Sequence, residues 1–284
     1  MKFKIGVMVD SFRLGIREGL KKAKEVGADG VQIYAVRGEM DPDNLNKQSR
    51  HDLFQYIKDQ GLVVSALCGD LGSPGFANAE LNPARIEKSK RIVDLACELE
   101  TSVITTHIGV VPQNQSSKRF KIFQAACNEI GGYAEKMGCH FAIETGPERS
   151  STLRSFLDTL ETTGVGVNFD PANLAMVIGE DAAEAVANLG PYIVHTHAKD
   201  GIQYKPIDPE LVYDPEKLSA SPEVQLPDYF REVPLGEGQV NWPQYLNALQ
   251  KEGFSGFLTI EREVGENPEG DIRQAIEFLK EMLT

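Results

Sequence analysis

Residues 135–144, EKMGCHFAIE, contain the unit on which the fold prediction rests: the end of an amphipathic segment, a glycine and a short apolar run. Glycine just past a helix end suits a left-handed C-terminal cap, and a brief apolar run directly after it is typical of a buried strand. The same unit recurs at residues 24–34, 58–66, 161–170 and 250–261. Its repetition predicts that helices alternate with parallel strands.

Eight short apolar runs occur along the chain, and a helical pattern such as residues 84–99 separates most of them. Eight strands alternating with helices over this length predict an α/β fold, the (β/α)8 TIM barrel. An open doubly wound sheet is the alternative, but no GxGxxG or GxxxxGK[ST] motif follows any run to bind a phosphate. The runs are residues 5–9, 31–34, 63–67, 103–107, 141–144, 166–170, 193–197 and 257–261.

One segment interrupts the alternation of strands and helices. The 284 residues suit a single barrel domain spanning 1–284, with a long insertion at about 201–239 after the seventh strand. The insertion is rich in proline and acidic residues. A long connection after a barrel strand lies on the face where active sites form, so we expect either a lid, a subunit contact or a passive excursion of the chain.

The charge of the chain limits its partners. The 42 acidic and 29 basic residues give a net charge of -13, which argues against nucleic acid and an anionic membrane as partners. The four cysteines are widely spaced and form no CxxC pair, as expected in a reducing compartment. The apolar run at the N-terminus reaches Asp10 too soon for a signal peptide. We therefore expect a cytoplasmic protein.

Ionisable side chains stand at the ends of the last five predicted strands. Barrel chemistry is expected at the carboxyl ends of the strands, and side chains two positions apart in a strand share one face. His195 and His197 therefore share a face, and the same parity applies to Asn168 with Asp170 and to Thr259 with Glu261. The strand-end residues are His107, Glu144, Asp170, His195, His197 and Glu261.

Four of these residues are expected to converge if the last member of each pair faces the barrel axis: Glu144, Asp170, His197 and Glu261. Three carboxylates so close together repel one another unless a cation neutralises them. Oxygen-rich ligands with one imidazole suit a divalent metal ion such as Mn²⁺, Mg²⁺ or Co²⁺, with Zn²⁺ also possible. The alternative is a ring of ion pairs with Arg149, Lys199 and Arg262.

Several motifs resemble a known family. IET at residues 143–145, FDPAN at 169–173, HTHAKD at 195–200, and the closing stretch with LGEGQV at 235–240 and GFLTIE at 256–261 are similar to the xylose isomerase-like barrel superfamily. Within it, the sequence most resembles sugar isomerases and epimerases of the tagatose 3-epimerase type. The resemblance implies a divalent ion, often manganese, held by Glu144, Asp170, His197 and Glu261. It also implies that Glu144 and Glu261 are the catalytic acid/base groups.

The expected chemistry is removal of a proton from carbon next to a carbonyl, through a metal-stabilised enediolate. A second carboxylate across the sugar can return the proton to the other face. We therefore expect an isomerase, either a ketose 3-epimerase or an aldose–ketose isomerase, acting on a small sugar whose phosphorylation is left open. An inosose-type dehydratase, which is a lyase, and a non-catalytic sugar-binding barrel are the alternatives.

Other polar residues are expected around the substrate. His107 could bind a hydroxyl group or be a buried structural histidine, and His195 could be a supporting or core residue. Lys199 and Glu148 could reach hydroxyl groups or remain solvated. Asn173 occupies a position where many members of the family have histidine, and an amide can bind a hydroxyl group but is a weak metal ligand.

Two further expectations concern related enzymes and assembly. Apurinic-site endonucleases of the same superfamily need several more histidines than this chain offers, which together with the net charge argues against DNA repair. A homodimer or homotetramer is compatible with the acidic surface and the insertion.

Overall fold

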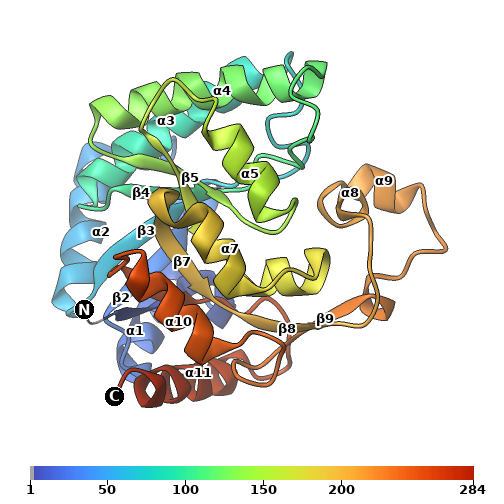
Figure 1. Ribbon diagram of the computed structural model, residues 1–284. Coiled ribbons are helices and arrows are strands. Elements are labelled where there is room, and N and C mark those ends of the chain that lie inside the picture. Colours follow the sequence, from blue (N-terminus) through green and yellow to red (C-terminus); the bar gives the residue numbers. More distant parts are fainter. Residues whose placement is uncertain (1–2) are drawn as a thin grey trace.

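The computed structural model describes residues 3–284 and contains a closed barrel of eight parallel strands (Figure 1). The barrel closes where Lys4 of the first strand is in register with Phe257 of the last. This pairing confirms the predicted TIM barrel and excludes an open sheet. The strands are β1 (Lys4–Met8), β2 (Gly30–Tyr34), β3 (Val63–Cys68), β4 (Val103–Thr106), β5 (His140–Glu144), β6 (Val165–Phe169), β7 (Ile193–Ala198) and β10 (Phe257–Ile260).

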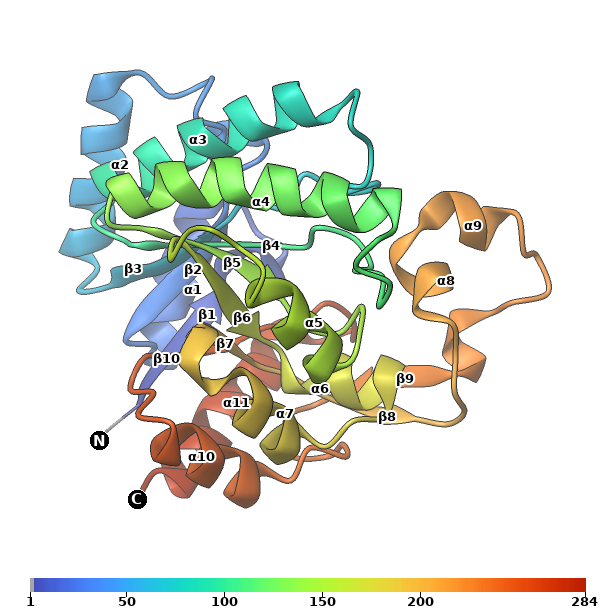
Figure 2. The same ribbon diagram turned by 45° about the horizontal axis from the view of Figure 1, so that its top comes forward.

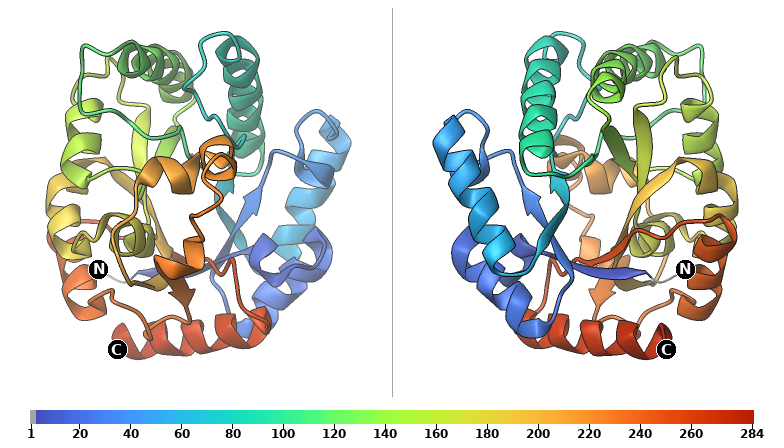
Figure 3. Two further views of the ribbon diagram at one scale, coloured as in Figure 1. Left: turned by 90° about the vertical axis from the view of Figure 1, so that its right-hand side faces the viewer. Right: turned by 90° about the vertical axis from the view of Figure 1, so that its left-hand side faces the viewer.

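Helices surround the barrel, as Figure 2 and the two views of Figure 3 show. Their apolar faces are buried against the outer side of the strands; Leu20, Ile92 and Leu279, from three different helices, are completely buried. The main helices are α1 (Ile16–Val26), α2 (Lys47–Asp59), α3 (Asn82–Glu98), α4 (Lys118–Lys136), α5 (Ser150–Leu157), α7 (Ala182–Leu189), α10 (Trp242–Lys251) and α11 (Pro268–Met282).

The glycines of the repeated unit do not all have the same purpose. Gly138 adopts a φ of 69° just after α4, as a left-handed cap requires. Gly164 was expected to be another such cap, and this is wrong. A Cβ at Gly164 would lie 2.1 Å from the carbonyl oxygen of Gly131 in α4. Glycine is required there because the chain passes very close to the helix backbone.

The segment after β7 forms an antiparallel ribbon of β8 (Asp200–Gln203) and β9 (Phe230–Val233). The ribbon carries two short helices, α8 (Pro209–Tyr213) and α9 (Pro215–Ser219). In the left view of Figure 3 this orange segment lies in front of the barrel opening. It therefore covers the face at which the strands end.

None of the helices in residues 3–284 combines the length with the apolar composition needed to cross a bilayer.

Candidate metal centre

Four strands bring Glu144, Asp170, His197 and Glu261 to one point. Glu144 ends β5 and His197 is the fifth residue of β7, whereas Asp170 and Glu261 directly follow β6 and β10. One ligand atom from each residue lies within 4.8 Å of the other three. Parallel strands in a barrel end at the same face, so residues that end different strands meet although they are far apart in sequence.

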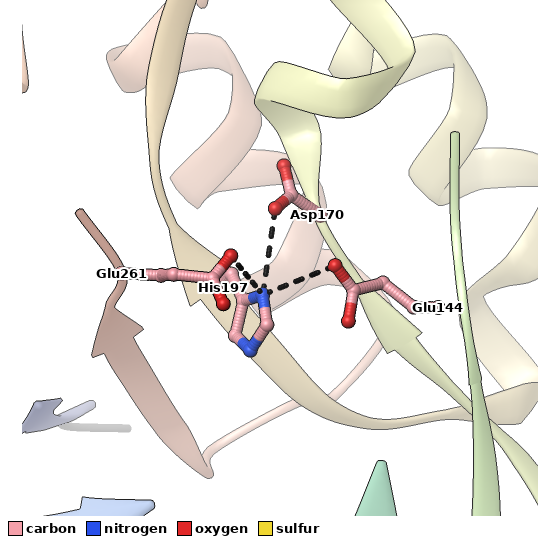
Figure 4. A group of neighbouring side chains, drawn as sticks. All are labelled: Glu144, Asp170, His197 and Glu261. Carbon is pink, nitrogen blue, oxygen red and sulfur yellow. Dashed lines mark hydrogen bonds and ion pairs between the residues drawn. The ribbon is translucent and has the colours of Figure 1, made fainter. Parts of the chain in front are cut away.

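The imidazole of His197 lies in the middle of the three carboxylates (Figure 4). Its Nδ1 atom is 3.5 Å from Glu144 Oε1, 3.4 Å from Asp170 Oδ2 and 3.3 Å from Glu261 Oε2. All four side chains are buried. Figure 4 shows Glu144 and Glu261 approaching His197 from opposite sides, with Asp170 between them.

Neighbouring amide groups orient Glu144. Asn168 Nδ2 donates to Glu144 Oε2 at 3.0 Å, and Asn173 Nδ2 donates to Glu144 Oε1 at 3.1 Å. Both carboxylate oxygens are thus held by a buried donor, which fixes the plane of the group.

Asp170 is oriented by the backbone turn that follows it. Its Oδ1 atom accepts the amide N–H of Asn173 at 2.9 Å, as the N-cap of the short helix α6 (Pro171–Asn173). Proline at the first helical position suits this turn because its fixed φ is helical and it needs no hydrogen-bond acceptor. The cap leaves Oδ2 free to face the centre.

His197 is held by its second ring nitrogen. Gln32 Nε2 donates to Thr105 Oγ1 at 2.8 Å, which turns Gln32 Oε1 toward His197 Nε2 at 3.1 Å. Since Gln32 Oε1 can only accept, Nε2 carries the hydrogen of this bond. Nδ1 then faces the three carboxylates and is the ring nitrogen that can offer its lone pair to a metal ion, which is the arrangement of a metal-binding histidine.

The charges of the cluster require compensation. Burial alone would lower the pKa of His197, but Glu261, Glu144 and Asp170 outweigh burial and raise this pKa well above its usual value. A histidine that binds a metal ion is neutral, so in the metal-bound state three carboxylates carry a charge of about -3 and Lys199, with Nζ 3.0 Å from Glu261 Oε2, supplies one positive charge. A divalent cation would neutralise the remaining two charges, so the residues present fit a metal ion.

The alternative of an ion-pair ring is borne out only for Lys199. Arg262 instead pairs with Glu232 and Asp271, at 2.5 Å and 2.8 Å. Within residues 3–284, Arg149 makes no ion pair with the four residues. Even with a protonated His197, Lys199 does not balance three carboxylates, and the two arginines add no positive charge to the cluster.

A cavity of about 660 Å³ opens above this cluster, within the range of small-molecule sites. His107, Asn173 and Lys199 line it, as expected for residues near a substrate. His107 Nδ1 lies 3.3 Å from Asp70 Oδ2, and its Nε2 lies 3.8 Å from Glu144 Oε1. Burial would lower the pKa of His107, but Glu144 and Asp70 outweigh it and raise this pKa to about 9.

The structure does not bring His195 or Glu148 to the cavity, so neither is placed to contact substrate. For His195 this agrees with the alternative of a supporting or core residue, and for Glu148 it corrects the expectation that it reaches hydroxyl groups or remains solvated. His195 is buried one pleat below His197, where its ring nitrogens contact Asn168 Oδ1 at 2.9 Å and Thr259 Oγ1 at 3.0 Å. Both of its polar atoms are therefore used inside the barrel. Glu148 is buried beneath the loop after β4, where its Oε2 accepts the amide N–H of Val111 at 2.9 Å.

Sequence reasoning missed several residues that line the cavity. Asp70 follows β3, and its position two residues after the strand could have revealed it. Tyr213 comes from the insertion, and its ring packs on His107 with centroids 5.2 Å apart. No periodic pattern in the sequence indicates that contact. The other missed polar residues are Tyr34, Ser73, Arg231, Glu232 and Glu263.

Comparison with known proteins identifies a sequence relative and several solved structures with the same fold. An uncharacterized protein of Methanocaldococcus jannaschii is 26% identical over 237 residues, covering 78% of this chain and 70% of that protein. The structure is similar to a xylose isomerase domain protein from Planctomyces limnophilus, with a TM-score of 0.80, 24% identity and coverage of 99% and 96% of the two chains.

Two further solved structures share the fold. A D-tagatose 3-epimerase-like protein matches with a TM-score of 0.74, 20% identity and coverage of 100% of this chain and 97% of that chain. A probable 3-DHS dehydratase from Bacillus anthracis matches with a TM-score of 0.74, 19% identity and coverage of 98% and 99%. The sequence model of one family matches residues 20–282, and the chain therefore belongs to the family described as Xylose isomerase-like TIM barrel.

Proposed function

We propose that the protein is a metal-dependent sugar isomerase or epimerase, of the ketose 3-epimerase type, that moves a proton at the carbon next to a carbonyl group. The observation that carries this proposal is the pair of buried carboxylates, Glu144 and Glu261, on opposite sides of His197 Nδ1 (Figure 4). One carboxylate can remove a proton from one face of a substrate while the other returns a proton to the opposite face.

Glu144, Asp170, His197 and Glu261 would hold the cation through three carboxylates and one imidazole. When bound, a divalent cation supplies positive charge to the carbonyl and neighbouring hydroxyl oxygens of the substrate, where negative charge develops. Mn²⁺ is our first expectation, and Mg²⁺, Co²⁺ and Zn²⁺ also suit these ligands.

The two catalytic carboxylates have different surroundings. Burial would raise the pKa of Glu261, but Lys199 and His197 outweigh it and hold this pKa well below its usual range, so Glu261 is ionised and can accept a proton. Glu144 has no lysine or arginine within ion-pair distance among the described residues. Its orientation depends on Asn168 and Asn173 instead.

His107 and Asn173 complete the polar end of the site in this proposal. Both line the cavity beside Glu144, and both offer nitrogen donors to hydroxyl groups of a sugar. Lys199 holds Glu261 in place and reaches the same cavity.

Dehydration is the second candidate, because proton removal next to a carbonyl can also expel a hydroxyl group from the adjacent carbon. The similarity in fold to a probable dehydratase supports it. A barrel that binds a sugar without turning it over is the third candidate, but such a protein needs only the binding residues and not two opposed carboxylates.

Proton NMR of the products separates these functions. Metal-depleted protein is incubated with a panel of ketoses, ketose phosphates and inososes, before and after Mn²⁺ is restored. The proposal predicts a new sugar of unchanged mass, formed only with the metal ion. A product lighter by one water would assign the dehydratase, and tight binding of a panel member without any product would assign the sugar-binding protein.

A further inference from the structure

The cavity above the metal centre has two chemically different parts. The part formed by the barrel strands carries Glu144, Lys199, Glu261 and His107. The insertion faces this polar part and contributes mainly apolar side chains to the lining, namely Val212, Tyr213, Leu226, Pro227 and Phe230. Met176 and Val177, from the single turn of π-helix after α6 (Leu174–Ile178), and Val264 extend this apolar wall.

Packing and an ion pair hold the apolar wall in place. Met176 and Val177 form a small apolar cluster against which Val212, Tyr213 and Phe230 pack. Arg119 of α4 pairs with Glu210 of α8 at 2.5 Å, which ties the insertion to the opposite side of the barrel opening. These contacts hold the apolar wall in a defined position relative to the barrel.

The wall remains open to a ligand. The side chains of Val212, Leu226 and Phe230 are only partly buried, and Val264 is 48% exposed. Apolar side chains that stay exposed together around a cavity are typical of a ligand-binding site.

The charges around the cavity are unsuited to a phosphate group. Lys199 is already surrounded by carboxylates, with Glu261 at 3.0 Å, Asp170 at 3.9 Å and Glu263 also in contact. Arg231 is the other lysine or arginine among the lining residues of the described chain. Five carboxyl groups line the same cavity, those of Asp70, Glu144, Glu232, Glu261 and Glu263, and they outnumber these two basic groups.

We infer that the substrate is an uncharged hydroxy-carbonyl compound whose distal end carries an apolar substituent, which packs on the wall formed by the insertion. This inference rests on the proposed function for the polar end of the molecule. A hydroxyl group placed against Phe230 and Val264 would lose its hydrogen bonds to water without a replacement, whereas an apolar group there would gain from leaving water. The insertion is therefore the element that selects the substrate.

A ketohexose series that differs only at its terminal carbon tests this inference. The members carry a hydroxyl group, hydrogen, a benzyl ether or a phosphate, and their binding to the Mg²⁺-loaded protein is measured by calorimetry, with turnover followed by NMR. We expect the benzyl ether to bind at least about tenfold more tightly than the parent ketohexose, and the phosphate to bind more weakly than the parent.

Three variants test whether the apolar wall is responsible for the preference for the benzyl ether. Phe230→Asn and Val264→Asn should each reduce the ratio of benzyl-ether to parent affinity severalfold. Val63→Asn, which changes an equally exposed valine (49%) at the start of β3, should leave the ratio unchanged.

Three outcomes would overturn the inference: the parent or the phosphate binding as tightly as the benzyl ether, no member of the series binding, or a ratio that is the same in all variants. Binding with the expected ratio but no proton transfer to or from any member would instead reject the proposed function.

Discussion

At the scale of single residues, two glutamates four positions apart have very different environments. Glu144 accepts hydrogen bonds from two side-chain amides and faces His197. Glu148 accepts one hydrogen bond, from the backbone N–H of Val111, and is buried away from the cavity. The Oε1 atom of Glu148 is buried without a hydrogen-bond partner, and burial raises the pKa of this carboxyl group to about 8. Glu148 is therefore a protonated acid at neutral pH.

This environment predicts that Glu148→Gln stabilises the protein at neutral and alkaline pH. Between pH 4.5 and 8 the unfolded chain ionises Glu148 while the folded chain keeps its proton, so this residue lowers stability by about 1.4 kcal/mol per pH unit. Glutamine keeps the acceptor for Val111 and does not ionise. Urea unfolding at pH 7.5 should show a gain on the order of 3 kcal/mol over the wild type.

The same comparison at pH 5 is the control, because this pH lies only half a unit above the pKa of 4.5 in the unfolded chain, so ionisation there costs little stability. We expect the two proteins to differ there by less than about 1 kcal/mol. An equal difference at both pH values would show that Glu148 does not titrate as described.

Asn168 provides a second test at this scale. Its Nδ2 atom donates to Glu144 Oε2 at 3.0 Å and its Oδ1 atom lies 2.9 Å from His195 Nδ1, so it fixes the carboxylate plane of one of the four metal-binding groups. Loss of such a supporting residue lowers metal affinity about 10–100-fold in known sites. Calorimetric titration with Mn²⁺ should show this loss for Asn168→Ala and none for Asn128→Ala, which changes a surface asparagine in α4. Unchanged affinity in Asn168→Ala would contradict the arrangement.

The convergence of the four residues was predictable because period-two alternation and strand ends are local properties of the sequence. The surroundings of Glu148 and His195 were not predictable in this way. Whether a polar group reaches a cavity depends on the loop that covers it, here the loop containing Val111, and on the layer of the barrel that it occupies. Neither leaves a periodic signal in the sequence.

At the scale of elements, the carboxylate of Asp200 binds the backbone of the LGEGQV motif, residues 235–240, which follows the insertion. Its carboxylate accepts four donors: the amide N–H groups of Gly201, Gly236 and Val240, and the indole N–H of Trp242. A Cβ at Gly238 would lie 2.0 Å from Asp200 Oδ1, so only glycine fits there. This one buried carboxylate joins the base of the ribbon to the start of α10.

Asp200→Asn should destabilise the protein by about 2–5 kcal/mol. The amide nitrogen that replaces one carboxylate oxygen faces N–H donors and leaves two of them unpaired in the interior. Asp208→Asn is the matched control, because Asp208 is an exposed N-cap at which asparagine is equally suitable. We expect a change within about 0.5 kcal/mol for the control in urea unfolding. Equal effects of the two substitutions would show that the carboxylate of Asp200 does not hold the base of the ribbon to the start of α10.

The strands and helices were predictable because each helix, glycine and strand unit carries its own local signal. Gly164 shows the limit of that reasoning, since the sequence cannot distinguish a glycine that caps a helix from one that passes close to a neighbouring backbone. The contacts of the insertion were also beyond prediction. The pair of Arg119 with Glu210 joins residues 91 positions apart and depends on how the segment folds back over the barrel.

At the scale of the whole molecule, part of the negative charge is concentrated at the candidate metal centre. The sequence carries a net charge of -13, and three of its carboxylates lie within a few ångströms of each other inside the barrel. A bound divalent cation would reduce both the total negative charge and this local repulsion. Metal binding should therefore stabilise the folded protein.

Thermal unfolding with and without Mn²⁺ measures this stabilisation. A metal ion at about one hundred times its dissociation constant contributes about 2.7 kcal/mol, which corresponds to a rise in Tm of roughly 4–5 °C for a chain of 284 residues. The Asp170→Asn variant keeps the N-cap bond from Oδ1 but has one negative charge fewer, so most of the rise should disappear. A rise of equal size in this variant would place the metal ion elsewhere.

Deuterium exchange from heavy water tests the central claim most directly, namely that Glu144 and Glu261 move a proton at a metal site. The account predicts that the Mn²⁺-loaded protein incorporates solvent deuterium at the carbon next to the carbonyl of a ketose it binds. Glu261→Gln should slow this exchange at least about 100-fold, whereas Glu263→Gln, at a partly exposed residue that also pairs with Lys199, should keep most of it. Exchange that survives both chelation and Glu261→Gln, or no exchange into any ketose that binds, would contradict the account.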